Sequence, residues 1–243
     1  MAFKLTYKPF GERAILVEWP QLINDDILKD IINFKKKIEK FNIESLVEIK
    51  SSYNSLLIIY GDFVENYKYE IAIIDKIYSL NKNFLKTDAV SWKIPVCYDD
   101  EFGLDLELIA NEKKISKSDI ISRHYQANYT VYFIGFLPGF LYLGGLDKTL
   151  HFPRKETPRL QLKKGAVAIG GNQTGVYPNT SPGGWNVIGN SPINFFDPTK
   201  EKPCFAKSGD RIQFYPISLK EYYDIKTLVD TNVYQMESEV ICD

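Results

Sequence analysis

The sequence is poor in cysteine and histidine. Its 243 residues include three cysteines, Cys97, Cys204 and Cys242, and two histidines, His124 and His151, and no two of these lie close together. An odd number of widely spaced cysteines argues against a disulfide framework, and the spacing of neither residue type matches a zinc motif. We therefore expect reduced thiols and no metal site.

The sequence also lacks an excess of charge of either sign and a long hydrophobic run. It carries 30 Lys and Arg against 31 Asp and Glu, which excludes the strongly basic surface of a typical nucleic-acid-binding protein. The most apolar stretch, 131–146, is shorter than the ~20 residues of a membrane span, and glycine and proline interrupt it. The first residues lack the apolar core of a secretory signal. We expect a cytoplasmic protein with no nucleic-acid partner and no membrane contact.

Two halves of the chain differ in composition. Glycine and proline are sparse up to about residue 85 and frequent from about residue 91, which predicts one domain over 1–86 and another over 91–243. In the first half, strand-like runs alternate with two helical patterns, one capped by Asn24 and one over about 65–80. The order ββαββα with short connections predicts a small α+β sandwich.

The second half contains many short apolar runs separated by turn residues. The clearest of these runs are 92–96, 129–136, 166–169, 186–189 and 211–215, and two short helices are expected near 104–111 and 118–126. Short strands with frequent glycine and proline between them predict an all-β domain that is a closed or nearly closed barrel.

The turns between residues 129 and 189 hold cationic and polar candidates for a site. Arg154 and Arg159 stand in one proline-containing loop, and together they could clamp a carboxylate or phosphate, because a guanidinium presents a planar pair of donors. The alternative is a salt-bridged barrel rim. Gln173 and Thr174 could bind a small polar ligand or could only cap their own turn.

The remaining candidates also have two interpretations each. Gly170 and Gly171 could bring backbone N–H groups close to a ligand, or could form a tight barrel turn. Tyr177 and Trp185 could stack on a ligand, although packing of the barrel end explains them more simply. His124 could act as an acid or base, and the alternative is a satisfied structural histidine. The sequence has no P-loop and no dinucleotide-binding motif, so any ATP is not held in a P-loop of this chain.

Several motifs together resemble one known family, the B subunits of prokaryotic 5-oxoprolinase (PxpB). This family is also described as allophanate hydrolase subunit-one-like and as a KipI-type inhibitor of a sporulation histidine kinase. The resemblance runs nearly end to end, and its most specific segments are 9–18, 94–98, 135–142, 153–159, 170–178, 181–189 and 208–212.

The resemblance implies an α+β N-terminal domain and a cyclophilin-like β-barrel. It also implies a protein that is inactive or weakly active alone and that works with the A and C subunits of 5-oxoprolinase. That complex uses ATP to open the lactam of 5-oxo-L-proline to L-glutamate. The resemblance matches His124 to a histidine of the family's motif. We thus expect catalytic roles for His124, Arg154 and Arg159, and substrate-binding roles for Gly170, Gly171, Gln173, Thr174, Tyr177 and Trp185.

Three other functions stay open at this point. Inhibition of a histidine kinase would use the barrel surface, as the inhibitor name within the family suggests. A biotin-dependent system acting on urea or allophanate follows from relatives in which this module is fused to others, although this chain has no Met-Lys biotinylation context. Proline isomerase activity would rest only on the barrel analogy, and fold does not fix function.

Overall fold

The structure of the chain is a computed structural model, which describes residues 3–80 and 89–241. The chain divides into two compact units, Met1–Thr87 and Asp88–Asp243. Each unit has a hydrophobic core of its own. Cys242 lies outside the described residues, and Cys97 and Cys204 are free thiols. Among the described residues, no helix combines the length and the apolar character needed to cross a bilayer.

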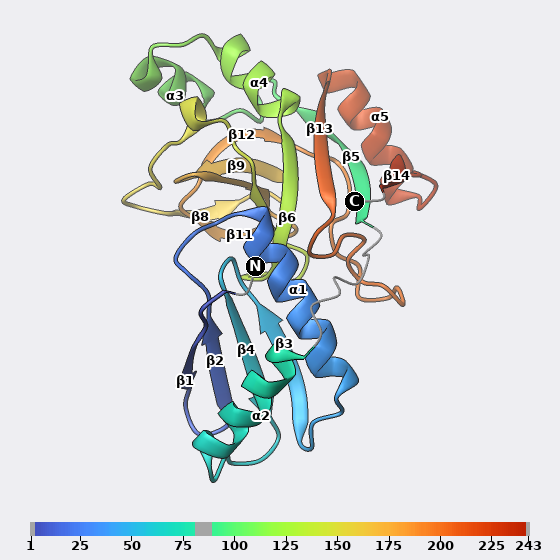
Figure 1. The fold of residues 1–243 in the computed structure, drawn as a ribbon. Helices are drawn as coiled ribbons and strands as arrows, with labels where there is room; N and C mark the ends of the chain where they lie inside the picture. Colours follow the sequence, from blue (N-terminus) through green and yellow to red (C-terminus); the bar gives the residue numbers. More distant parts are fainter. Residues whose placement is uncertain (1–2, 81–88, 242–243) are drawn as a thin grey trace. The chain divides into compact units, whose positions relative to one another are not determined.

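The first unit contains one antiparallel sheet and two helices (Figure 1). Its elements are β1 (Thr6–Pro9), β2 (Ala14–Glu18), α1 (Asp25–Lys40), β3 (Leu46–Ser51), β4 (Ser55–Tyr60) and α2 (Tyr67–Ser79). The strands are arranged in the order β1-β2-β4-β3. The Asn24 side chain accepts a hydrogen bond from the Ile27 amide, which confirms the predicted start of α1.

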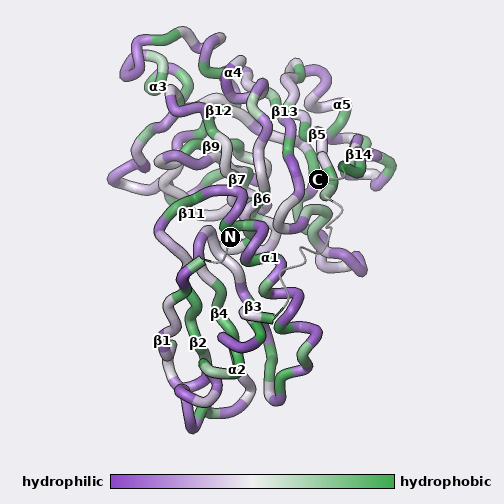
Figure 2. Tube along the Cα trace, viewed as in Figure 1, coloured by the Kyte–Doolittle hydropathy of each residue, from purple (hydrophilic) through white to green (hydrophobic). Residues whose placement is uncertain are grey.

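Alternating burial fixes which face of this sheet meets the helices. Along β4, Leu56, Ile58 and Tyr60 are buried and the residues between them are half-buried. The same core contains Ile31 and Phe34 from α1. Figure 2 shows hydrophobic residues along β2 and β4. Burial of apolar side chains on one sheet face is the main stabilising term for a unit of this size.

The second unit is built on a closed β-barrel. Its strands are β5 (Ala89–Cys97), β6 (Asn128–Ile134), β7 (Leu141–Gly144), β9 (Ala166–Gly170), β10 (Gln173–Val176), β12 (Asn186–Asn190), β13 (Arg211–Ile217) and β14 (Ser238–Ile241). They follow the order β12-β9-β10-β7-β6-β13-β5-β14, and a pairing of Asn190 with Cys97 joins β12 to β5. The predicted barrel is therefore confirmed. A separate two-stranded sheet pairs β8 (Arg159–Leu162) with β11 (Ser181–Gly183).

Three α-helices and one 3-10 turn accompany the barrel. They are α3 (Leu106–Lys113), α4 (Lys117–Gln126), η1 (Lys148–Leu150) and α5 (Leu219–Asp230). Helices α3 and α4 match the two expected helices, but α5 was not predicted. Ser218 and Glu221 form a capping box at the start of α5, and their Ser-x-x-Glu spacing was the signal in the sequence that could have revealed it.

A buried aspartate joins the beginnings of two neighbouring barrel strands. Asp210 is 1% exposed and accepts hydrogen bonds from the Val90 amide, the Trp92 indole and the Lys207 amide. It stands directly before β13, which runs parallel to β5. Because each donor is itself partly or fully removed from water, its hydrogen bond to the carboxylate is costly to lose.

Replacement of Asp210 with Ala should lower the free energy of unfolding by about 3 kcal/mol, because three donors lose a charged acceptor. Urea denaturation followed by circular dichroism measures this change. The matched control is Asp224→Ala, which removes an exposed aspartate on α5 and should cost no more than about 0.5 kcal/mol. Equal losses in the two variants would contradict a structural role for the Asp210 hydrogen bonds.

Candidate functional site

Backbone hydrogen bonds bring three of the glycine- and proline-rich segments together on the barrel. Phe152 and Gly171 exchange two backbone hydrogen bonds of 2.9 and 2.7 Å. The Lys155 amide donates to Gly184 O at 2.8 Å. The Asn186 side-chain amide donates to Pro153 O at 2.8 Å. Residues 152–155 therefore lie against the β9–β10 turn and the start of β12.

An aromatic cluster lies beside these segments. The ring of Phe140 lies 4.9 Å from that of Tyr142, 5.2 Å from that of Tyr177 and 5.5 Å from that of Trp185. Tyr177 is 2% exposed and Trp185 is 5% exposed. A Cβ atom on Gly170 would lie 2.4 Å from the Trp185 ring, so this position has no space for a larger residue. The structure therefore assigns Tyr177 and Trp185 a packing role, and stacking on a ligand stays a prediction.

Arg154 is the exposed cation of this region. Within residues 3–80 and 89–241 it forms no hydrogen bond or ion pair. Burial raises the pKa of the Tyr142 phenol, and the charge of Arg154 partly offsets that rise. Burial also raises the pKa of Tyr177, against the opposing effects of a backbone hydrogen bond from Trp185 and of the Arg154 charge. Arg154 thus acts electrostatically on the edge of the aromatic cluster and keeps its donors available.

Arg159 is committed to a buried carboxylate. Its two terminal nitrogens donate to Asp105 at 2.7 and 2.9 Å. Lys155 Nζ lies 2.8 Å from the same carboxylate, and the Val187 amide donates to it at 2.7 Å. Arg154 and Arg159 therefore do not form a clamp together. Of the two interpretations, the salt-bridged barrel rim is the one that fits Arg159. Asp105 and Lys155 were not among the predicted site residues.

The charge state of Asp105 follows from these partners. Burial alone would raise its pKa, but hydrogen bonds from Arg159, Lys155 and the Val187 amide outweigh burial and lower it. Asp105 is 2% exposed, so its negative charge is held inside the protein by two cations. The same ion pair raises the pKa of Arg159.

The β9–β10 turn is closed by its own hydrogen bonds. Gly171 has a φ of +66°, the left-handed conformation that favours glycine. Its amide donates to Phe152 O, so it is not free to donate to a ligand. Gln173 is half-buried at the start of β10, and Thr174 is completely buried. Gly171 is exposed but has no side chain, so Gln173 is the one of these residues whose side chain has exposed surface beside the turn.

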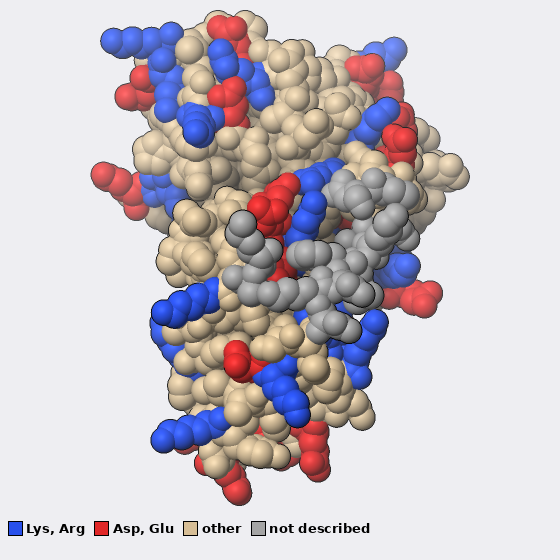
Figure 3. Space-filling view, viewed as in Figure 1, with Lys and Arg blue, Asp and Glu red and all other residues tan. Residues whose placement is uncertain are grey.

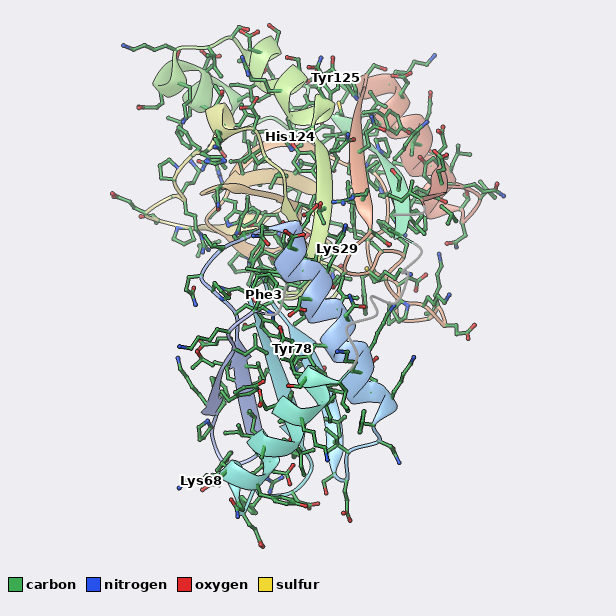
Figure 4. All side chains as sticks on the ribbon, in the orientation of Figure 1. Phe3, Lys29, Lys68, Tyr78, His124 and Tyr125 are labelled. Atoms are coloured by element: carbon green, nitrogen blue, oxygen red, sulfur yellow. The ribbon has the colours of Figure 1, made fainter. Side chains whose placement is uncertain are left out.

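His124 lies on α4 (Figure 4) and is completely buried. Its Nδ1 lies 2.7 Å from the Tyr98 hydroxyl, and its Nε2 lies 2.9 Å from Thr174 Oγ1. Thr174 donates its proton to Ala168 O, so it accepts from Nε2, and Nδ1 accepts from Tyr98. Both ring nitrogens are thus satisfied. The imidazole also stacks on Phe214 at 4.8 Å.

Burial alone lowers the pKa of His124 to about 3. A histidine that is neutral, enclosed and bonded through both nitrogens has no proton site open to a substrate. The contacts support the structural interpretation of His124, and the predicted acid or base role has no support from this geometry.

Polar side chains cap four of the α-helices in the described residues. Asn24, Asn66, Ser116 and Ser218 each cap a helix with their own side chains. Asp105 precedes α3 and makes no capping hydrogen bond with its side chain. Phosphates bind at helix N-termini through free backbone N–H groups, and each of these four cap side chains already accepts a hydrogen bond from one N–H group of its helix. The described residues also contain no group of three or more His, Cys, Asp or Glu side chains that could hold a metal ion.

Comparison with known proteins gives one family. The family model for the carboxyltransferase domain, subdomain C and D, matches residues 5–206. The 5-oxoprolinase B subunit of Bacillus subtilis is 32% identical over 93% of this chain and 98% of that protein. The urea amidolyase of Saccharomyces cerevisiae is 24% identical over 97% of this chain, and the alignment covers 14% of that protein.

The fold also matches a solved structure. The crystal structure of the Kluyveromyces lactis urea carboxylase superimposes with a TM-score of 0.84 over 99% of this chain and 24% of that chain. The sequence identity is 23%, so this similarity is one of fold alone.

His124 should make the stability of the protein depend on pH. The unfolded chain binds a proton near pH 6.5, whereas the folded protein binds one only near its lower pKa of about 3. Stability from this group is therefore complete above pH 6.5 and is lost as the pH falls toward 3. We expect the free energy of unfolding to decrease by about 2 kcal/mol between pH 7 and pH 5, measured by urea denaturation.

Two variants distinguish the contribution of His124 to this pH dependence from that of other titratable groups. His151→Gln removes the other histidine and should keep the decrease. His124→Gln should be less stable than wild type at pH 7. Its free energy of unfolding should then change little between pH 7 and pH 5. A pH dependence that is the same in wild type and His124→Gln would show that His124 is not the responsible group.

Proposed function

The chain belongs to the family of 5-oxoprolinase B subunits, and from this we propose that it works as the B subunit of an ATP-dependent 5-oxoprolinase. The complex would contain the A and C subunits as well and would convert 5-oxo-L-proline and water to L-glutamate. The near-complete overlap with the Bacillus subtilis protein, at 32% identity, supports this proposal. We propose that the chain is inactive alone.

One observation connects this function to the chain. Arg154 carries an unpaired charge among the described residues, on a segment that hydrogen bonds hold beside an aromatic cluster. The proposed substrate has a carboxylate on a compact lactam ring, which is polar at the amide and apolar at its methylene groups. A guanidinium donates two parallel hydrogen bonds to a carboxylate, and aromatic side chains accept the apolar part. We therefore propose that Arg154 binds the substrate carboxylate.

The reaction itself adds water across the C–N bond of the lactam. The carbonyl carbon gains a hydroxyl oxygen, and the ring nitrogen leaves as the amino group of glutamate. Negative charge that develops on the carbonyl oxygen needs fixed donors. ATP would supply activation of that oxygen, and we propose that another protein of the complex holds ATP, since this chain has no P-loop and no dinucleotide-binding motif.

A second candidate function is suggested by the urea amidolyase relative. Nearly the whole chain aligns with a 14% portion of that protein, so the same module also occurs inside a larger polypeptide. An enzyme of this type would act on urea or allophanate, which lack a carboxylate-bearing ring, and any biotin would belong to a partner. Inhibition of a histidine kinase stays a prediction, with no contact among the described residues that favours it.

Reconstitution tests the proposed function directly. Release of glutamate from 5-oxo-L-proline is measured with ATP for this chain alone, for the A and C subunits without it, and for all three together. We expect activity only in the full mixture. If the assembled complex releases no glutamate but consumes ATP with urea or allophanate, the second candidate is favoured instead.

In the active mixture, Arg154→Gln should raise the KM for 5-oxo-L-proline at least tenfold, because a charge-assisted pair of hydrogen bonds is lost. The control Lys202→Gln removes an exposed cation elsewhere in the second unit and should leave the KM within about twofold. An unchanged KM in Arg154→Gln would remove Arg154 from the binding site.

A further inference from the structure

The segment that carries Arg154 is held by contacts on both sides of that residue. Before it, the Asn186 side chain bonds to Pro153 O at 2.8 Å. After it, the Lys155 amide bonds to Gly184 O at 2.8 Å. Arg154 itself contributes none of these bonds. The position of its backbone is therefore set by its neighbours, and its side chain stays free among the described residues.

Ion pairs with one buried carboxylate also hold this segment. Asp105 binds Lys155 and Arg159, which follow Arg154 in the segment. It also exchanges hydrogen bonds with the Val187 backbone, which fixes it to β12. Asp105 thus ties two side chains of the segment to the barrel wall at a position that is 2% exposed.

The three cations of the segment have different surroundings. Lys155 and Arg159 share the charge of Asp105 at 2.8 and 2.7 Å, and Arg154 shares none of it. Figure 3 shows the usual surface pattern on one face of the molecule, where blue cationic atoms are interspersed with red acidic ones. Lys155 and Arg159 are both paired with Asp105, whereas Arg154 has no carboxylate partner among the described residues, so its charge is open to a ligand.

We propose that Asp105 is a positioning residue for a carboxylate-binding site, acting through the segment 153–159 on Arg154. The inference rests on the proposed function, because it takes the ligand to be the carboxylate of a small lactam substrate. Asp105 touches no substrate in this scheme. It holds the backbone from which Arg154 reaches the substrate, and preorganisation of that backbone reduces the entropy that binding must overcome.

A purely structural role makes a different prediction. Removal of one partner from a buried ion pair destabilises a protein wherever the pair lies. Such a loss would reduce the amount of folded protein without changing how the folded molecules bind 5-oxo-L-proline. Asp210 is a suitable comparison, because it is also a buried aspartate of the second unit, and its hydrogen bonds go to residues 90, 92 and 207, outside the segment.

A double-mutant cycle in the assembled complex tests the proposal. Asp105→Asn should raise the KM for 5-oxo-L-proline about tenfold with kcat changed less than threefold, and the double variant with Arg154→Gln should be no worse than Arg154→Gln alone. The control Asp210→Asn should leave the KM unchanged. Effects of Asp105→Asn and Arg154→Gln that multiply in the double variant would overturn the proposal. If Asp105→Asn fails to fold, Lys155→Gln replaces it in the same cycle.

Hydrogen exchange of the full chain supplies a measurement that needs no activity. With mass spectrometry, Asp105→Asn should increase the exchange rate of peptides covering 153–159 several-fold more than Asp210→Asn does. An equal increase in both variants, or none in either, would overturn the positioning role. If the wild-type complex does not act on 5-oxo-L-proline, the proposed function fails, while the exchange experiment still decides whether Asp105 holds the segment.

Discussion

Closure of the barrel is the constraint on which the second unit depends. The pairing of Asn190 with Cys97 joins β12 to β5, so the seven strands from β12 to β5 form a ring. A closed sheet has no unpaired edge within the ring, and its interior has to be filled by side chains. Polar groups that are buried in this unit need hydrogen-bond partners within the protein, and this requirement decides the roles of the buried polar residues.

Three of the buried titratable residues, His124, Asp210 and Asp105, meet that requirement in different ways. His124 stays neutral and uses Tyr98 and Thr174 as neutral partners. Asp210 is bonded by two backbone amides and an indole. Asp105 needs two cationic side chains. The first two solutions are local to the core. The ion pairs of Asp105 extend to the surface, because Lys155 and Arg159 are partly exposed. They therefore connect a buried carboxylate to a surface segment.

The sequence predicted local features well and long-range partners poorly. The helix after Asn24 and the strand Ser55–Tyr60 were correct because caps and alternation are visible within a few residues. Helix α5 was missed although its capping box was readable. The partner of Arg159 could not be found, because Asp105 lies 54 positions away and only the fold joins them. Arg154 and Arg159 look equivalent in the sequence, and that distant carboxylate separates them.

Membership of a motif and participation in chemistry are therefore different properties. His124 belongs to a recognisable part of the family resemblance, yet its burial and its two hydrogen bonds give the barrel a fixed internal link between α4 and β10. Arg154 belongs to a segment of high specificity, and its exposed side chain has no structural task among the described residues. Its neighbours hold its backbone through hydrogen bonds of Pro153 and Lys155, and its guanidinium donors stay available for a ligand. The proposed carboxylate site therefore rests on Arg154, whereas the contacts of His124 are those of a residue that holds the core together.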